Sequence, residues 1–261
     1  MLILSLESSA KPASVALCSD GKLLGQYFQN SGLTHSRTLL VMAESLLRNL
    51  DISTTDIDFV AVSRGPGSFT GVRIGVSAAK GLAWGLDKPV CSVSTLEALA
   101  YQTPESGVLI CPVMDARRGQ VYNALFEWRD AMLVRLCDDR AVSLEDLSAE
   151  LHGTMRASSP ITSHSPLPDA MPPRFQNPNS ELRVPSSPLL LVGDGAQLSY
   201  DYLSAAGIPC RIAPDLMRWQ TAYGVALAAM SAERIPATEL EPSYLRPSQA
   251  ERERQGQMLN A

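Results

Sequence analysis

The stretch that most constrains this chain is a glycine-rich turn between an apolar run and a helical pattern. Residues 57–62 are almost all apolar and predict a short buried strand. The Gly-Pro-Gly sequence at 65–67 predicts a tight turn, because Gly adopts dihedral angles that other residues avoid and Pro fixes its own. Small and apolar residues then recur at helical spacing over 71–86, and Ser68 and Thr70 can cap the first turn. The chain therefore holds a strand, a glycine turn and a helix in direct succession.

This turn has two interpretations. Its backbone N–H groups, open at a helix N-terminus, would suit an anion. The pattern is nevertheless neither G-x-G-x-x-G nor the P-loop sequence. Gly71, Gly75 and Ala79 recur at four-residue spacing, which lets another element approach the helix closely. We therefore favour close packing over phosphate binding.

Composition excludes several classes of protein. A net charge of −5 over 261 residues argues against a stand-alone nucleic-acid binder. The five cysteines are odd in number and scattered, which predicts free thiols in the reducing cytoplasm. The apolar run at 2–6 is too short for a signal peptide, and no stretch is long enough to span a membrane.

The order of predicted elements indicates an α/β protein. Three strands joined by hairpins, at 2–6, 14–18 and 22–29, precede an amphipathic helix at 34–50. Helices and strands then alternate, which predicts mixed sheets flanked by helices, in an order similar to the actin-like, ribonuclease-H-like ATPase fold.

We expect two lobes, at 1–105 and 106–261. Within the second lobe, residues 153–188 are rich in Pro and Ser, which predicts a disordered insertion.

Catalytic candidates are few. None of the three histidines pairs with another at metal-binding spacing, and His35 is better explained as a helix N-terminal residue or an interface contact. Glu7 and Asp194 follow predicted strands and would be the acids of a nucleotide cleft, or else ordinary capping residues. Asp115 and Arg117 follow another strand, where ligands often bind, although a hairpin start with local ion pairs is the simpler interpretation.

Four stretches taken together resemble the signatures of the TsaB (YeaZ) family, a bacterial subunit of the tRNA threonylcarbamoyladenosine machinery. They are Ser63–Arg73, Met114–Tyr122, Gly193–Ala196 and Pro242–Arg246. The resemblance runs along essentially the whole chain, with the Pro/Ser-rich insertion as the main departure.

The resemblance implies an actin-like, two-lobed scaffold with no catalysis and no cofactor of its own. Its partner would be a catalytic TsaD-like subunit, which carries a metal-binding histidine pair where this chain has Thr95 and Leu99. With a TsaE-like ATPase, the pair would transfer threonylcarbamoyl to N6 of adenosine 37 in tRNAs that read ANN codons. The chain would meet tRNA only through this complex.

The resemblance also implies that helices of the N-terminal lobe bind the partner, and a homodimer through the same helices stays open. The candidate interface residues are His35, Leu39, Leu40, Ala43, Leu47, Val72, Gly75, Val76 and Ala79. We expect Ala79→Arg to weaken the heterodimer.

A second set of residues belongs to the family motifs and would contact an anion or a nucleotide. This set is Glu7, Gly65, Gly67, Ser68, Thr70, Gly71, Arg73, Asp115, Arg117, Gly193 and Asp194. An independent actin-like ATPase or kinase is the alternative function. A metallopeptidase is less favoured, because the histidine pair is missing.

Overall fold

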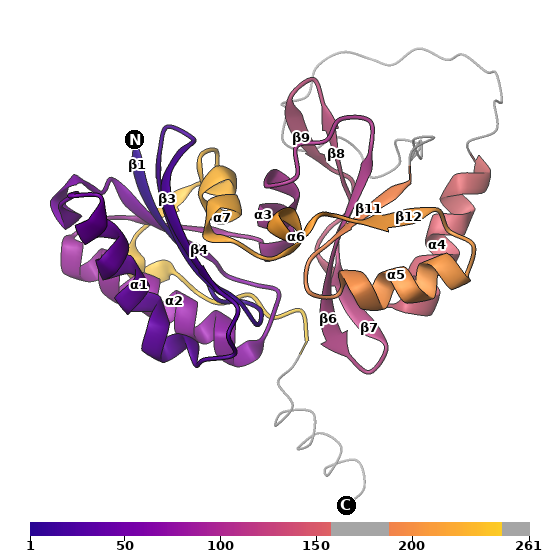
Figure 1. The fold of residues 1–261 in the computed structure, drawn as a ribbon, viewed down its shortest axis with the longest axis horizontal. Helices are drawn as coiled ribbons and strands as arrows, with labels where there is room; N and C mark the ends of the chain where they lie inside the picture. Colours follow the sequence, from indigo (N-terminus) through magenta and orange to yellow (C-terminus); the bar gives the residue numbers. More distant parts are fainter. Residues whose placement is uncertain (158–187, 247–261) are drawn as a thin grey trace, which may run out of the picture.

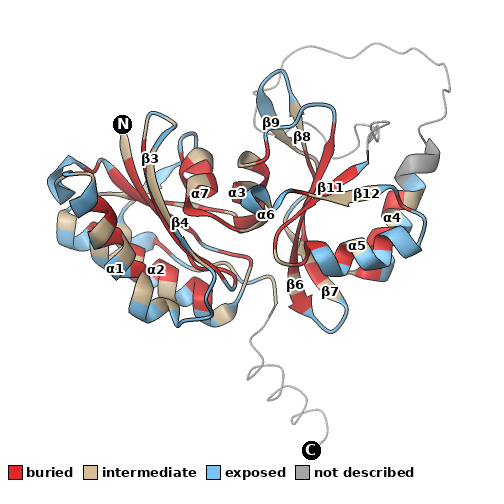
Figure 2. Ribbon diagram, in the orientation of Figure 1, coloured by how far each residue is buried: buried red, intermediate tan, exposed pale blue. Residues whose placement is uncertain are grey.

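The computed structural model describes residues 1–157 and 188–246, and within them two mixed β-sheets lie side by side (Figure 1). Helices cover both sheets, and the buried residues concentrate where helix and sheet meet (Figure 2). None of the helices in these two segments is long and apolar enough to cross a membrane.

The first sheet has six strands in the order β13-β5-β4-β1-β2-β3. These strands are β1 (Leu2–Glu7), β2 (Ala13–Ser19), β3 (Lys22–Gln29), β4 (Phe59–Ser63), β5 (Val90–Val93) and β13 (Arg234–Ile235). The first three form antiparallel hairpins as predicted, whereas β1, β4 and β5 run parallel. Parallel neighbours place their carboxyl ends at one edge, so the loop after β1 lies beside the glycine turn after β4.

Two long helices cover one face of the first sheet. They are α1 (His35–Asn49) and α2 (Phe69–Leu86), and their apolar sides pack with the strands into one core. The helix α7 (Ala222–Ala229) covers the opposite face, as Figure 1 shows.

The second sheet has seven strands, with β6 next to β7, β8 and β11. They are β6 (Leu109–Arg117), β7 (Gln120–Asn123), β8 (Phe126–Arg129), β9 (Met132–Arg135), β10 (Arg140–Ser143), β11 (Leu189–Val192) and β12 (Cys210–Ile212). The helices α4 (Leu144–Ala157) and α5 (Ala196–Ala205) pack on one face through leucine side chains.

The short helix α3 (Thr95–Tyr101) lies between the two sheets (Figure 1). Ala98 packs into the first lobe, and Leu96 and Leu99 pack against strands of the second. The sequence predicts a helix over 95–102 with Thr95 as its cap. In the structure Thr95 is the first residue of the helix, and the hydroxyl of Ser94 accepts the N–H groups of Leu96 and Glu97 instead. Three shorter helices complete this part of the chain: η1 (Thr54–Asp56), α6 (Asp215–Arg218) and η2 (Ala237–Glu239).

Three predicted boundaries differ from the structure. The helix α4 continues to Ala157, so the first residues of the predicted insertion at 153–188 are helical, and most of the rest lies outside the described residues. The apolar pattern from Thr221 predicts a last helix that reaches Glu233. The helix α7 ends at Ala229, because the chain turns to pair β13 with β5. The predicted division after residue 105 separates most of the two sheets, but α7 and β13 return from the C-terminal half to the first sheet.

Candidate functional site

The segment at 242–246, which we term the strap, lies across the glycine turn. The Ser243 N–H donates a hydrogen bond of 2.7 Å to the carbonyl oxygen of Arg64. Gly65 has φ +116°, and a Cβ at this position would collide with the carbonyl oxygen of Ser243. The turn therefore needs glycine here, both for its backbone conformation and for the approach of the strap.

The other side of the glycine turn packs on the loop between β1 and β2. The Ser68 N–H donates to the carbonyl oxygen of Ser9 at 2.6 Å, and the Ser8 hydroxyl donates to the carbonyl oxygen of Gly71 at 2.8 Å. A side chain at Gly67 or Gly71 would strike this loop. The Ser68 hydroxyl also accepts the Gly71 N–H at 3.3 Å, so Ser68 caps α2 as predicted. The favoured close packing is therefore what the structure shows at this turn.

Aromatic and cationic side chains fix the strap to α2. The rings of Phe69 and Tyr244 have centroids 4.8 Å apart, and the Arg73 guanidinium lies 3.8 Å from the Phe69 centroid. The Arg73 Nε–H also donates to the Tyr244 hydroxyl at 2.8 Å. The next cation, Arg246, donates to the carbonyl oxygen of Ala116 in the second lobe at 2.8 Å. Three of the four stretches that carry the family resemblance therefore meet here.

Glu7 lies beneath this turn, fully buried at the end of β1. Its Oε1 accepts the Ser9 N–H at 2.6 Å, while Oε2 has no hydrogen-bond partner among residues 1–157 and 188–246. Burial raises the pKa of the Glu7 carboxyl, and the hydrogen bond from the Ser9 N–H opposes that shift only in part. The ring of His35 contacts the same loop, with Nε2 2.8 Å from the carbonyl oxygen of Ala10.

The acidic candidates of the second lobe, Asp115 and Asp194, form hydrogen bonds with residues other than those around Glu7. Asp115 accepts the Arg117 N–H at 2.7 Å and pairs with its guanidinium at 3.6 Å. Asp194 accepts a hydrogen bond of 2.8 Å from Gln220, a contact that no sequence pattern indicated. Burial raises the pKa of Asp194, and the nearby carboxylate of Asp115 adds to the rise. Gly193 packs against the carbonyl of Val113.

A groove of about 560 Å³ lies between α1 and α2. It is lined by His35, Ser36, Leu39, Leu40, Phe69, Thr70, Arg73, Ile74, Ser77 and Ala78. Of the predicted interface residues, only Leu40 is well exposed, at 47%, and His35 is half-buried. The other seven are buried: Leu39, Ala43, Leu47, Val72, Gly75, Val76 and Ala79. Ala79→Arg would therefore disrupt the core, so it cannot serve as an interface test.

The outer side of α2 carries a row of small residues beside this groove. Ser77, Gly81 and Gly85 are exposed at four-residue spacing. A Cβ added to either glycine would meet no atom within 4 Å, so the fold itself does not require glycine there. Glycine inside a helix lowers stability by about 1 kcal/mol relative to alanine. Contact with another molecule therefore explains Gly81 and Gly85 better than packing within this chain does. On α1, Leu40 and Val41 expose 47% and 58% of their surfaces.

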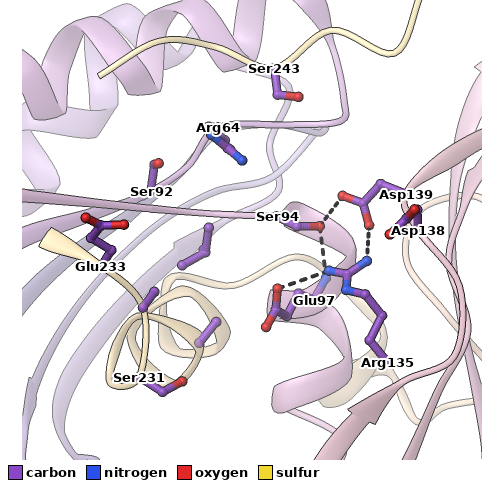
Figure 3. Close-up of a pocket in the computed structure, with 13 residues that line it drawn as sticks. Arg64, Ser92, Ser94, Glu97, Arg135, Asp138, Asp139, Ser231, Glu233 and Ser243 are labelled. Carbon is purple, nitrogen blue, oxygen red and sulfur yellow. Dashed lines mark hydrogen bonds and ion pairs between the residues drawn. The ribbon is translucent and has the colours of Figure 1, made fainter. Parts of the chain in front are cut away.

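A polar pocket of about 570 Å³ lies where α3, β9 and the strap come together (Figure 3). The Arg135 guanidinium bridges Glu97, at 3.0 Å, and Asp139, and the Ser94 hydroxyl donates to Asp139. This network joins α3 to the hairpin of β8 and β9. Sequence reasoning missed it, because its members are up to 45 residues apart and belong to no motif.

Thr95 and Leu99 both lie in α3 and are buried between the lobes. Over the two described segments, no three His, Cys, Asp or Glu side chains are grouped so as to hold a metal ion.

Comparisons with known proteins agree with this architecture. A family model described as "TsaD: tRNA N6-adenosine threonylcarbamoyltransferase" matches residues 29–252. Two solved structures from Pseudomonas aeruginosa resemble the fold, each over 94% of this chain and 99% of theirs. YeaZ has a TM-score of 0.66 at 22% identity, and a protein described as similar to peptidase YEAZ has a TM-score of 0.68 at 24% identity. The predicted fold class is thereby confirmed.

Two curated relatives bear the description "tRNA threonylcarbamoyladenosine biosynthesis protein TsaB". The Bacillus subtilis protein is 39% identical over 146 residues, which is 56% of this chain and 64% of the relative. The Escherichia coli protein is 38% identical over 129 residues, 49% of this chain and 55% of the relative. The matched part thus spans less than two thirds of either relative. Together with the family model, these matches show that the chain belongs to the family that the TsaD model describes, and within it to the TsaB (YeaZ) proteins.

Proposed function

We propose that this chain is a non-catalytic scaffold subunit in the biosynthesis of threonylcarbamoyladenosine in tRNA. It binds a TsaD-like catalytic subunit through α1 and α2, and the pair recruits a TsaE-like ATPase. The complex transfers threonylcarbamoyl to N6 of adenosine 37 in tRNAs that read ANN codons. The relatives described as TsaB biosynthesis proteins support the pathway.

The observation that carries the proposal is the outer face of α1 and α2. Leu40 and Val41 expose apolar surface to solvent, and the groove beside them is predominantly apolar. The row of Ser77, Gly81 and Gly85 allows the backbone of another helix to come close. A helical partner that packs here would bury this apolar surface, and its backbone would lie against the exposed glycines.

The non-catalytic part of the proposal is supported by Thr95 and Leu99. These positions match the histidine pair expected in the catalytic subunit, and neither a hydroxyl nor an isobutyl group replaces imidazole as a metal ligand. The TsaD-like subunit would therefore hold the reaction centre, and this chain would stabilise that subunit.

The test is association with the TsaD-like protein of the same organism, measured by size-exclusion chromatography with light scattering. We expect a stable one-to-one complex from the wild-type chain. Leu40→Arg should weaken it by about tenfold or more, because a charge would be buried in an apolar contact. Gly81→Leu should weaken it similarly by filling the space along α2.

Leu216→Arg is the matched control, because Leu216 is 94% exposed on α6 in the other lobe. It should leave the complex unchanged. If the Leu40 and Gly81 variants associate as well as the control, the assignment of this face is wrong. If the wild-type chain fails to associate even with nucleotide and the TsaE-like protein present, the scaffold role itself is contradicted.

A further inference from the structure

The side of α2 proposed for the partner continues past the groove, towards the C-terminal end of the helix. Thr70 and Ser77 line the groove, and Trp84 follows at the same interval of seven residues, which is close to two helical turns. Gly81 lies between Ser77 and Trp84, four residues after the one and three before the other, so it belongs to the same side. All four residues are exposed. They form one continuous strip along α2, which we term the α2 strip.

Trp84 is the largest apolar residue of the α2 strip, and it is 81% exposed. Within residues 1–157 and 188–246, no ring and no guanidinium packs on its indole. Because burial is what makes an apolar surface stabilising, an indole left in water contributes little to the fold of this chain. Tryptophan is also enriched among the few residues that carry most of the affinity of a protein interface.

The surroundings of Trp84 leave room on both sides of the indole. Gly81 and Gly85 present no side chains beside it. A hollow of about 640 Å³ also begins at Trp84, and Pro89, Pro236 and Ala237 are apolar members of its lining. A helix whose backbone lies against the two glycines would therefore bring its own side chains against the indole.

The charge beside Trp84 indicates what the partner presents at the rim of this contact. Lys80 precedes Trp84 by four residues, so both side chains lie on the same side of α2. Lys80 and Asp87 both line the hollow, but in the described segments Lys80 makes no ion pair with Asp87 or any other acid. A carboxylate of the partner would complement Lys80, and such rim pairs set the orientation and the rate of association more than the affinity.

We propose that Trp84 is the main anchor of the partner interface. Its indole inserts into an apolar pocket of the TsaD-like subunit, and Lys80 pairs with a carboxylate at the rim of that pocket. The inference rests on the proposed function, and it adds which residue carries the affinity and what chemistry the partner presents. The α2 strip from Thr70 to Trp84 is about 21 Å long, so the partner helix that covers it has about four turns.

The test measures the dissociation constant of this chain with the TsaD-like protein of the same organism, by isothermal titration calorimetry. Trp84→Ala should weaken the complex about thirtyfold or more, and Trp84→Phe by less, because phenylalanine keeps an apolar ring. Lys80→Glu should weaken it about threefold, mainly by slowing association. Because Trp84 is exposed, the melting temperature of Trp84→Ala should stay close to that of the wild type.

Matched controls come from β3, at the far edge of the same sheet. Phe28 is 41% exposed, and Gln26, on the same side of this strand, accepts the Tyr223 N–H of α7. Phe28 therefore faces away from α2. Phe28→Ala removes an exposed aromatic ring there, and Lys22→Glu reverses an exposed charge. Both variants should bind the partner as the wild type does.

Fluorescence gives a second readout that reports on the indole itself. Tryptophan emission moves to shorter wavelength when the ring leaves water. The shift on formation of the complex should therefore be larger for the wild type than for Trp84→Phe.

The inference is overturned if Trp84→Ala binds the partner as tightly as Phe28→Ala while Leu40→Arg still weakens the complex, and the scaffold role then stands. It is also overturned if Trp84→Ala changes only the self-association of this chain, measured by light scattering of the chain alone, because Trp84 would then belong to a contact between copies. A wild-type chain that forms no complex under any condition would contradict both the anchor and the scaffold role.

Discussion

At the scale of single residues, ionisation of the buried Glu7 side chain opposes the fold. Burial raises its pKa, and its Oε2 lacks a hydrogen-bond partner in the described segments. The folded chain therefore holds this proton more tightly than the unfolded chain. The resulting loss of stability is absent below the ordinary pKa of glutamate and grows as pH rises through the folded value.

Glu7→Gln should consequently flatten the pH dependence of stability. Gln retains an oxygen that can accept the Ser9 N–H but carries no charge. We expect the variant to be more stable than the wild type near pH 8 and to lose this advantage towards pH 4, measured by urea unfolding at each pH. Glu233→Gln, at an exposed position, is the control. An advantage that grows on acidification would contradict this prediction.

The cysteines give a second prediction at this scale. All five are free, and burial raises the pKa of Cys18 and Cys111 to about 12 and that of Cys91 to about 11. Because the thiolate is the reactive form, these three should react slowly with a thiol reagent in the folded protein at neutral pH. Labelling followed by mass spectrometry checks this. After unfolding in urea, all five cysteines should be labelled. Rapid labelling of Cys111 in the folded protein would contradict the prediction.

At the scale of elements, the strap stabilises the glycine turn through one aromatic contact. Tyr244→Ala removes the stack on Phe69 and the hydrogen bond from Arg73, which should cost about 1–2 kcal/mol. Tyr202→Ala is a matched control, because Tyr202 is 41% exposed and Tyr244 is 40% exposed. Chemical denaturation of both variants gives the comparison. Equal losses would mean that the strap adds no stability.

The same contacts show what sequence reasoning can and cannot reach. Strands and helices of the first half were predicted closely, because apolar periodicity and the glycine turn are local signals. The strap could not be predicted to lie on that turn, because Arg73 and Tyr244 are 171 residues apart. Likewise, periodicity predicts that the helix at 34–50 is amphipathic, but it does not tell which apolar residues the core takes and which a partner could contact. Most of the residues predicted for the interface are therefore buried.

At the scale of the whole molecule, Arg246 connects the strap to the second lobe. Arg246→Ala should leave the melting temperature nearly unchanged but make the strap more accessible to a protease, since one hydrogen bond worth about 1 kcal/mol is lost. Arg129→Ala, which breaks an ion pair within one hairpin, should not alter cleavage there. Unchanged cleavage in Arg246→Ala would contradict a linking role.

The return of α7 and β13 to the first sheet has a consequence for synthesis. A ribosome releases β5 about 140 residues before β13, its antiparallel neighbour. At roughly 5–20 residues per second, the nascent chain waits about 7 to 28 seconds for this strand. During that interval the apolar side of the sheet that α7 covers, including Phe59 and Ala61, faces the surrounding medium. The first lobe is thus the last to be completed, although five of the six strands of its sheet are translated first.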